Sequence, residues 1–280
     1  MRPLRIGTRS SALAMWQAHH VQGLLGPFLE GRALELVQVE TEGDQRTDVA
    51  LNELSGDGAF TKAIQTALLR DEVDLAVHSL KDLPTIPIPG LTLASVPERG
   101  KVGDAFLSLN HSRFDELPQN ATVATSSLRR QAQLLNRRPD LNLIRRFRGN
   151  VDTRIRKLRD EGYDAIILAE AGLERLEVQE HITEVLSTEW MLPAVGQGAL
   201  GLECRESDEE TIALIMQIND PASFQAVTCE RSFLNRLAAG CQAPIGAIAT
   251  VEEGTLTLRA AVLSEDGRER IAEEISGLTS

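Results

Sequence analysis

The sequence predicts an α/β protein with two lobes of one architecture and a small α+β third domain. Strand-like and helix-like segments alternate from Leu4 to Leu168, a pattern typical of α/β folds. Short motifs recur in the same order in two blocks, and after Pro221 the pattern changes to one helix followed by three strands. At 280 residues the chain exceeds the size at which one core keeps growing, so two or three domains of roughly 100 residues are expected.

Each of the first two blocks alternates three strands with two helices. In the first block we expect strands at 4–7, 33–39 and 73–78 and helices at 11–25 and 61–70. In the second block we expect strands at 121–124, 142–144 and 163–168 and helices at 128–136 and 151–159. The blocks therefore predict two lobes that face a cleft, with the region around 96–103 as one crossing between them.

The two blocks also share letters at equivalent places. The strand-to-helix turn at Ile6–Ser11 has a counterpart at Val123–Leu128, and Leu69–Asp74 is echoed by Leu158–Asp164. These matches support two related lobes.

The chain after Pro193 is expected to return to the first lobe and then form the third domain. A Gly-rich stretch at 196–201, a strand-like segment at 202–204 and a helix at 209–218 complete the first lobe. Pro221 opens a helix to about residue 239, and strands follow at 245–251, 255–263 and 269–275. The expected domains are 1–98 with 194–218, 99–193, and 219–280.

Charge is distributed unevenly along the chain. The formal net charge is -12, which argues against a general nucleic-acid or anionic-membrane binder. Between Arg129 and Arg159, however, ten arginines and one lysine stand against two aspartates, a local balance of +9. This concentration of positive charge predicts a specific anionic ligand held in one place.

Composition also bears on compartment and metals. The longest apolar runs, such as Ala165–Ala169, are far shorter than the roughly 20 residues that span a bilayer, and the N-terminus has no apolar signal region, so we expect a cytoplasmic protein without a membrane partner. Three cysteines without a C-x-x-C pattern argue against a disulfide framework and a structural zinc site. The five histidines show no ligand spacing, and no metal is expected.

The segment Gly196–Gly201 matches G-x-G-x-x-G letter for letter. A dinucleotide-binding motif must follow a first strand and open a helix, whereas here a strand-like segment follows. We therefore interpret it as a conformationally demanding loop between domains.

Two strand-to-helix turns carry hydroxyl side chains. Free backbone N–H groups and hydroxyls at such turns can bind an anion, and the alternative is plain N-capping. One turn holds Arg9 and Ser11, and the other holds Thr125, Ser126 and Ser127. Arg129 and Arg130 follow the second turn, and guanidinium forks match carboxylate or phosphate oxygens, which favours the anion site there.

The wider arginine cluster has three interpretations: a solvated helix face, an RNA-binding surface, or a site for a polycarboxylate. Phe147 is the only aromatic residue inside the cluster, so platforms for base stacking are scarce. A polycarboxylate fits better, with Arg148 and Arg154 converging with Arg129 and Arg130 on one cleft.

The segment His78–Pro84 follows a buried strand at the end where open α/β sheets bind their ligands. Lys81 and Asp82 are either a surface ion pair before a turn or chemical groups. In the second case the Asp82 carboxylate stabilises a developing cation or moves a proton, and Lys81 binds acidic groups.

The three cysteines differ in their surroundings. Cys204 and Cys229 are expected to be packing residues, whereas Cys241 follows the Gly240 helix end in an irregular loop. A helix C-terminus disfavours a thiolate, so Cys241 suits a permanent covalent attachment better than a turnover nucleophile.

Six ordered motifs within residues 4–250 resemble the porphobilinogen deaminase (hydroxymethylbilane synthase) family. They are Gly7–Ala14, His78–Pro84, Thr125–Gln131, Arg148–Val151, Leu192–Gly201 and Gly240–Gly246. The resemblance implies two lobes similar to periplasmic binding proteins, a third domain, and a dipyrromethane cofactor joined by a thioether to Cys241. It also implies head-to-tail polymerisation of four porphobilinogens with loss of ammonia into hydroxymethylbilane.

The resemblance assigns roles residue by residue. Asp82 would stabilise positive pyrrole nitrogens and azafulvene intermediates and assist proton transfer. The acetate and propionate groups of the pyrroles would be bound by Arg9, Ser11, Lys81, Arg129, Arg130, Arg148, Arg154 and Arg175, with Thr125, Ser126 and Ser127 assisting. A monomer is expected, with porphobilinogen as substrate and no nucleic acid as partner.

The chain departs from the family pattern in two places. Gly56–Phe60 carries Asp57 where the family has a lysine, in a loop at 42–58 expected to be mobile beside the cleft. The chain stops at Ser280, where family members continue into a helix over the third-domain sheet, so we expect a truncated third domain. The alternative to the enzyme is a non-catalytic two-lobed organic-anion binding protein, and RNA binding stands third.

Overall fold

The computed structural model describes residues 2–41, 61–238 and 243–279. The loop expected at 42–58, with Asp57, and the expected attachment residue Cys241 lie outside the described residues.

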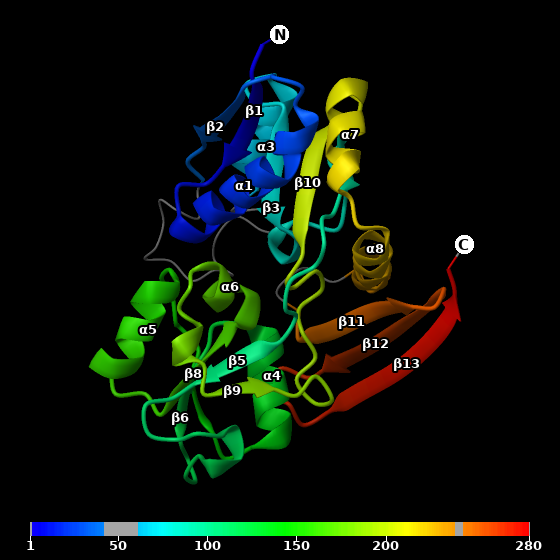
Figure 1. Ribbon diagram of the computed structural model, residues 1–280. Coiled ribbons are helices and arrows are strands. Elements are labelled where there is room, and N and C mark those ends of the chain that lie inside the picture. Colours follow the sequence, from blue (N-terminus) through cyan, green and yellow to red (C-terminus); the bar gives the residue numbers. More distant parts are fainter. Residues whose placement is uncertain (1, 42–60, 239–242, 280) are drawn as a thin grey trace.

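The first lobe is built on a five-stranded sheet with the order β2-β1-β3-β10-β4. Its strands are β1 (Leu4–Thr8), β2 (Leu34–Gln38), β3 (Leu75–Ser79), β4 (Leu91–Ser95) and β10 (Leu200–Arg205). Its helices are α1 (Ala12–Leu25), α3 (Lys62–Leu69) and α7 (Glu209–Ile215). β1 pairs in parallel with β2 and β3, whereas β10 runs antiparallel to β3 and β4. Figure 1 shows this lobe at the top of the molecule.

The second lobe repeats this architecture in the order β7-β6-β8-β5-β9. Its strands are β5 (Asp104–Leu107), β6 (Thr122–Ala124), β7 (Asn142–Ile144), β8 (Ala165–Ala169) and β9 (Glu184–Leu186). Its helices are α4 (Leu128–Arg137), α5 (Val151–Asp160) and α6 (Glu170–Arg175). β6 is parallel to β7 and β8, and β5 is antiparallel to β8 and β9, so strand order and direction match those of the first sheet.

Two crossing segments connect the lobes and lie side by side. The first leads from β4 to β5 and the second leads to β10, and each enters the fourth strand of its sheet. The N–H of Gly100 in the first segment donates to the carbonyl of Gly198 in the second at 3.2 Å. Gly198 has φ +85°, and a Cβ there would lie 2.6 Å from the carbonyl oxygens of Gly100 and Lys101. The Gly-rich motif is therefore a close-packed loop that a strand follows, as its sequence context indicates.

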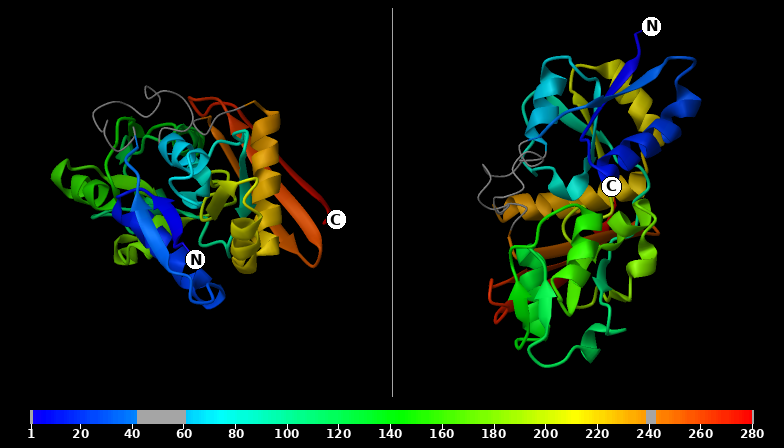
Figure 2. Two further views of the ribbon diagram at one scale, coloured as in Figure 1. Left: turned by 90° about the horizontal axis from the view of Figure 1, so that it is seen from above. Right: turned by 90° about the vertical axis from the view of Figure 1, so that its left-hand side faces the viewer.

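The third unit consists of α8 (Pro221–Arg236) and a sheet ordered β11-β12-β13. Its antiparallel strands are β11 (Ile245–Glu252), β12 (Thr255–Leu263) and β13 (Arg270–Leu278). One face packs against α8 through Leu234 and Ala247, and the other contacts the second lobe through Ala261, Ala132 and Leu192. The right-hand view of Figure 2 shows α8 lying across the molecule between the two lobes.

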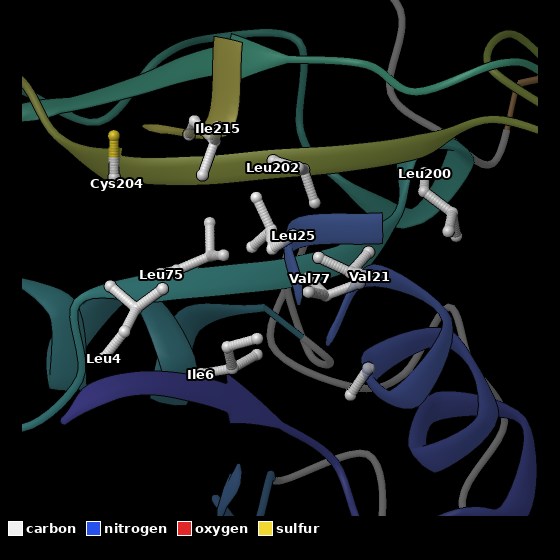
Figure 3. Close-up of a cluster of buried hydrophobic side chains, with 11 residues drawn as sticks. Leu4, Ile6, Val21, Leu25, Leu75, Val77, Leu200, Leu202, Cys204 and Ile215 are labelled. Carbon is white, nitrogen blue, oxygen red and sulfur yellow. The ribbon is translucent and has the colours of Figure 1, made fainter. Parts of the chain in front are cut away.

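In the first lobe, apolar side chains at every second position of β1 and β3 form one side of the core. Leu4 and Ile6 of β1 and Leu75 and Val77 of β3 point toward α1, where they meet buried Val21 (Figure 3). Period-two apolar residues place these side chains on one face, and burying each contributes about 1.5–3 kcal/mol.

The expected elements are present, with ends that differ by a few residues. The helix expected to 218 ends as α7 at Ile215 and continues as a 3-10 turn, Met216–Ile218, and the helix expected to about 239 ends at Arg236. The sequence analysis missed β4, β5, β9 and α6. Within the described ranges, no helix is long and apolar enough to cross a membrane.

Candidate active site

Lys81 and Asp82 lie in a 3-10 turn, Leu80–Asp82, directly after β3. Leu80 is buried and its N–H donates to the Ala199 carbonyl at 3.0 Å, which fixes the start of the turn against the second crossing segment. Asp82 is exposed, and its charge acts on both Lys81 and Arg154 of the second lobe. Burial, opposed by Asp82 and reinforced by Arg130, lowers the pKa of Lys81 to about 8.

The hydroxyl-bearing turns serve as helix starts. Ser11 caps α1, where its Oγ accepts the Ala14 N–H at 3.3 Å, and Arg9 lies half-buried in the same turn. Ser127 caps α4, where its Oγ accepts the Arg130 N–H at 3.4 Å. N-capping, the plainer interpretation of both turns, is therefore present at each of them.

Thr125 and Ser126 link the α4 turn to its surroundings. The Oγ1 of buried Thr125 accepts the Ser127 N–H at 3.4 Å, and the Ser126 hydroxyl donates to the Phe147 carbonyl at 3.0 Å. These bonds hold the turn against the segment that carries Arg148.

Arg129 and Arg130 are buried and share one carboxylate. Asp104, the first residue of β5, is 0% exposed. Its Oδ2 accepts Arg129 Nη1 at 2.6 Å, and its Oδ1 accepts Arg130 Nη2 at 2.7 Å and Arg130 Nε at 2.9 Å. The two guanidinium groups hold the pKa of Asp104 well below its usual range, although burial alone would raise it.

Gln197 joins this cluster to Lys81. Its amide Nε2 donates to Asp104 Oδ1 at 3.1 Å and to the Val102 carbonyl at 2.8 Å. Its Oε1 lies 3.5 Å from Lys81 Nζ. One side chain from the second crossing segment thus contacts groups of both lobes.

Arg154 completes the positive group. Its pKa is lowered to about 10, first by burial and then by the charges of Arg130 and Arg148, while Asp82 opposes the shift. These mutual effects place Arg148 and Arg154 beside Arg130 and Asp82. We call Lys81, Arg129, Arg130, Arg148 and Arg154 the cationic group.

Arg175 lies at the end of α6 and contacts the crossing and α1. Its Nη2 donates to the Gly198 carbonyl at 2.6 Å, and its guanidinium carbon lies 5.7 Å from the centre of the Trp16 ring. Burial lowers its pKa to about 10. The structure therefore gives Arg175 a place between the lobes.

A pocket adjoins Lys81 where the three units meet. It contains about 440 Å³ of space not filled by atoms, part of it open to solvent. Lys81 and Leu83 line it from the first lobe, Ser127 and Arg129 from the second, and Ala243 from the segment that leads into β11. The pocket thus extends from the predicted catalytic turn to within two residues of Cys241 in the sequence.

The two described cysteines are poor nucleophiles. Burial raises the pKa of Cys204 to about 12 and raises that of Cys229 as well, so both thiols stay protonated at neutral pH. Among the described residues, no three His, Cys, Asp or Glu side chains are grouped to hold a metal ion.

Three residues of this site were missed from the sequence. Asp104 begins β5 at the end of the first crossing segment, Gln197 lies in the second crossing segment, and Arg231 of α8 lines the pocket. The only sequence signal for Arg231 is its position: Phe224, Val227 and Arg231 follow the i, i+3, i+7 spacing that places residues on one face of a helix.

Comparison with known proteins places the chain among enzymes. The family described as "Porphobilinogen deaminase, dipyromethane cofactor binding domain" matches residues 4–213, and "Porphobilinogen deaminase, C-terminal domain" matches residues 224–279. The porphobilinogen deaminase of Syntrophotalea carbinolica is 50% identical over 273 residues, covering 98% of this chain and 86% of the relative. That of Brevibacillus brevis is 47% identical over 274 residues, covering 98% of this chain and 88% of the relative.

Solved structures that are similar to the chain include periplasmic binding proteins. The methionine binding protein MetQ gives a TM-score of 0.48 at 13% identity, over 82% of this chain and 93% of that one. The aliphatic sulphonate binding protein SsuA from Escherichia coli gives 0.43 at 16% identity, over 85% and 71%.

The sequence motifs, the two matching lobes beside the cationic group, and relatives of about 50% identity over nearly the whole chain agree on one assignment. The chain belongs to the porphobilinogen deaminase family.

Proposed function

We propose that this chain joins four porphobilinogen molecules head to tail into hydroxymethylbilane, with Asp82 as the catalytic residue and the cationic group as the binding site. Membership of the family makes the chain a transferase of tetrapyrrole biosynthesis with a dipyrromethane cofactor. The observation that carries the proposal is an excess of positive charge, on buried and half-buried side chains, where the three units meet. Five cationic side chains stand there against the buried carboxylate of Asp104 and the exposed one of Asp82.

The residues present fit a polycarboxylate. The Nε atoms of Arg129 and Arg154 are buried and have no hydrogen-bond partner among the described residues. A buried donor without an acceptor costs about 1–3 kcal/mol, and a carboxylate oxygen removes that cost. A bound anion would also raise the lowered pKa values of Lys81 and Arg154, because a nearby negative charge favours the charged form of each side chain.

The residues act by binding, charge and proton position. When bound, the dipyrromethane supplies the pyrrole carbon at which chain growth begins. The cationic group orients the acetate and propionate groups of the substrate, and Arg9, Ser11 and the Thr125–Ser127 turn extend this surface. Arg175 contributes from its place between the lobes. Asp82, an exposed carboxylate beside this positive group, stabilises the cation that develops as ammonia leaves and accepts the proton released when the rings join.

We place the covalent attachment at Cys241, in a third domain spanning 219–280, with 1–98 plus 194–218 and 99–193 as the lobes. The raised pKa values of Cys204 and Cys229 and the opening of the pocket toward Ala243 support this choice. We further propose a cytoplasmic monomer that needs no metal and binds neither membrane nor nucleic acid. The alternative, a non-catalytic organic-anion binding protein, does not account for the family match.

Intact mass tests the proposal. The purified chain is expected to exceed its 30.6 kDa polypeptide mass by two linked pyrrole units and to give a positive Ehrlich reaction in acid. Cys241→Ala is expected to lack both, and Asp82→Asn is expected to keep both while losing most turnover. An unmodified mass that persists after incubation with porphobilinogen contradicts the attachment, and full turnover by Asp82→Asn contradicts the assigned catalytic role.

A further inference from the structure

Arg231 of α8 holds the main chain directly after Asp82. Its Nη1 donates to the Leu83 carbonyl at 2.9 Å, and its Nη2 donates to the Pro84 carbonyl at 2.7 Å. The planar fork of one guanidinium thus spans two successive carbonyls, which the point charge of a lysine cannot do.

The turn that carries Asp82 is anchored at both ends. At its start, Leu80 is buried and its N–H bonds to Ala199. At its end, the Leu83 N–H closes the turn on the Leu80 carbonyl at 3.1 Å, and the chain continues extended into Pro84. Proline has no N–H, so the extended stretch holds its place largely through its carbonyls, and those of Leu83 and Pro84 are the ones that Arg231 binds.

The helix that carries Arg231 connects this turn to the third sheet. On one face of α8, Phe224 and Val227 pack with Leu80 and Leu83. Farther along the same face, Leu234 packs with Ile245 and Ala247 of β11. Arg231 therefore belongs to the face that touches the turn, and its helix ends shortly before the proposed attachment residue.

We propose that Arg231 is a positioning residue, which keeps the Asp82 carboxylate in register with the attachment domain by fixing the Leu83 and Pro84 carbonyls. The proposal rests on the assignment of Asp82 as the catalytic group. Displacing a catalytic group by about 1 Å costs up to about a hundredfold in rate. The fork of Arg231 thus acts on turnover without a contact to the reacting atoms.

The test compares Arg231→Met and Arg231→Lys in the holoenzyme. Arg231→Met is expected to keep the covalent pyrroles by intact mass and to lower kcat by about tenfold to a hundredfold, with KM changed less than threefold. Arg231→Lys is expected to recover only part of kcat, because an ammonium reaches one carbonyl. If Arg231→Met does not fold, the lysine variant alone carries the test.

Arg259→Met is the matched control. Arg259 of β12 also connects the third sheet to a lobe, because it donates to the Thr188 carbonyl at 3.2 Å and to Glu189 at 2.8 Å, and neither of these partners belongs to the Asp82 turn. It is expected to keep the wild-type kcat.

Each deviation has a definite meaning. Wild-type kcat in Arg231→Met, full recovery in Arg231→Lys, or an equal loss of kcat in Arg259→Met overturns the role of Arg231. Loss of covalent pyrroles or a large rise in KM overturns it as well, because Arg231 then binds a carboxylate directly. Asp82→Asn is measured beside these variants to distinguish two failures. If Asp82→Asn is fully active, the proposed function of Asp82 fails; if Asp82→Asn is inactive and the Arg231 variants deviate, only the role of Arg231 fails.

Discussion

The cationic side chains of this site differ in whether a carboxylate of the protein already balances their charge. Asp104 accepts hydrogen bonds from both Arg129 and Arg130, so these two guanidinium groups are fixed before any ligand binds. Burial lowers the pKa values of Lys81, Arg130 and Arg154, but of these only Arg130 is hydrogen-bonded to a carboxylate among the described residues, so Lys81 and Arg154 have most to gain from an anion. Preorganised and uncompensated cations thus occur side by side.

Lys81 gives the site a dependence on pH. Its pKa of about 8 lies below the ordinary lysine value, so the folded chain binds fewer protons than the unfolded chain between about pH 8 and 10.5. The contribution of Lys81 to stability therefore rises with pH through this window, and the charged form below pH 8 is the costly one. A bound carboxylate favours the charged form of Lys81, so the Lys81 amine takes up a proton when the anion binds.

We therefore predict that porphobilinogen binds Cys241→Ala, which lacks the tethered cofactor, about tenfold more weakly at pH 9 than at pH 7. Isothermal titration calorimetry in buffers of different ionisation enthalpy measures both the affinity and the proton uptake. Lys81→Arg, which stays charged, is expected to bind equally at both pH values. The same weakening in the arginine variant would assign the effect to another group.

At the scale of elements, the long periodic segments lie within a few residues of their expected places. β6 and β7 have only three residues each, and they were predicted from their place in the repeated alternation of strands and helices. β5, β9 and α6 have four, three and six residues, too few for a period to be recognised, and they lie where that alternation gave no position for them. β4 was missed although Leu91 and Leu93 stand at alternate positions in its five residues.

The same reasoning applies to the site. Lys81, Asp82 and the arginines stand in local motifs, so their residue types could be read from the sequence. Asp104 acquires its role only because β5 lies beside β8 in the sheet, which brings it to Arg130 from 26 residues away. Such pairings depend on tertiary packing, and no local pattern encodes them.

The crossing loop offers a test of an element. Gly198 has φ +85°, and a Cβ there would lie 2.6 Å from two backbone carbonyls, which cannot give way as a flexible side chain does. We predict that Gly198→Ala lowers the free energy of unfolding by about 1–3 kcal/mol or more and reduces activity, because it pushes the two crossings apart.

Urea unfolding followed by circular dichroism measures this change. Gly23→Ala is the control, since a Cβ there meets nothing within 4 Å in the middle of α1. It is expected to be neutral or to stabilise by up to about 1 kcal/mol. Equal stability of the two variants would mean that the crossings adjust freely.

At the scale of the whole molecule, one buried side chain connects the two crossing segments with the third sheet. Glu230 of α8, which is 0% exposed, accepts hydrogen bonds from Arg99 of the first crossing, Gly196 of the second, and Ala249 of β11. One buried carboxylate therefore joins both crossing segments to the third unit. Beyond it, β13 is exposed along its length, and Ile275 is 69% exposed.

The positive charge of this acidic molecule is concentrated in one segment of the second lobe, where it favours an anionic ligand. The net charge is -12, yet the segment from Arg129 to Arg159 carries +9 and contributes four members of the cationic group. Porphobilinogen has two carboxylates and one ammonium, a net negative charge. It is repelled by most of the surface and attracted to the cleft, and at about 0.1 M salt such fields act over about 10 Å.

We predict that kcat/KM falls by about threefold to tenfold when KCl is raised from about 20 mM to about 300 mM, whereas kcat changes little, because screening weakens encounter and leaves the bound state intact. Steady-state kinetics at constant pH measure both constants. Arg148→Gln is expected to flatten the salt dependence of kcat/KM, and Arg156→Gln, on the exposed side of α5 beside Asp160, is expected to leave it unchanged. An equal effect of the two variants would mean that net charge alone, and not the placement of charge in the cleft, guides the substrate.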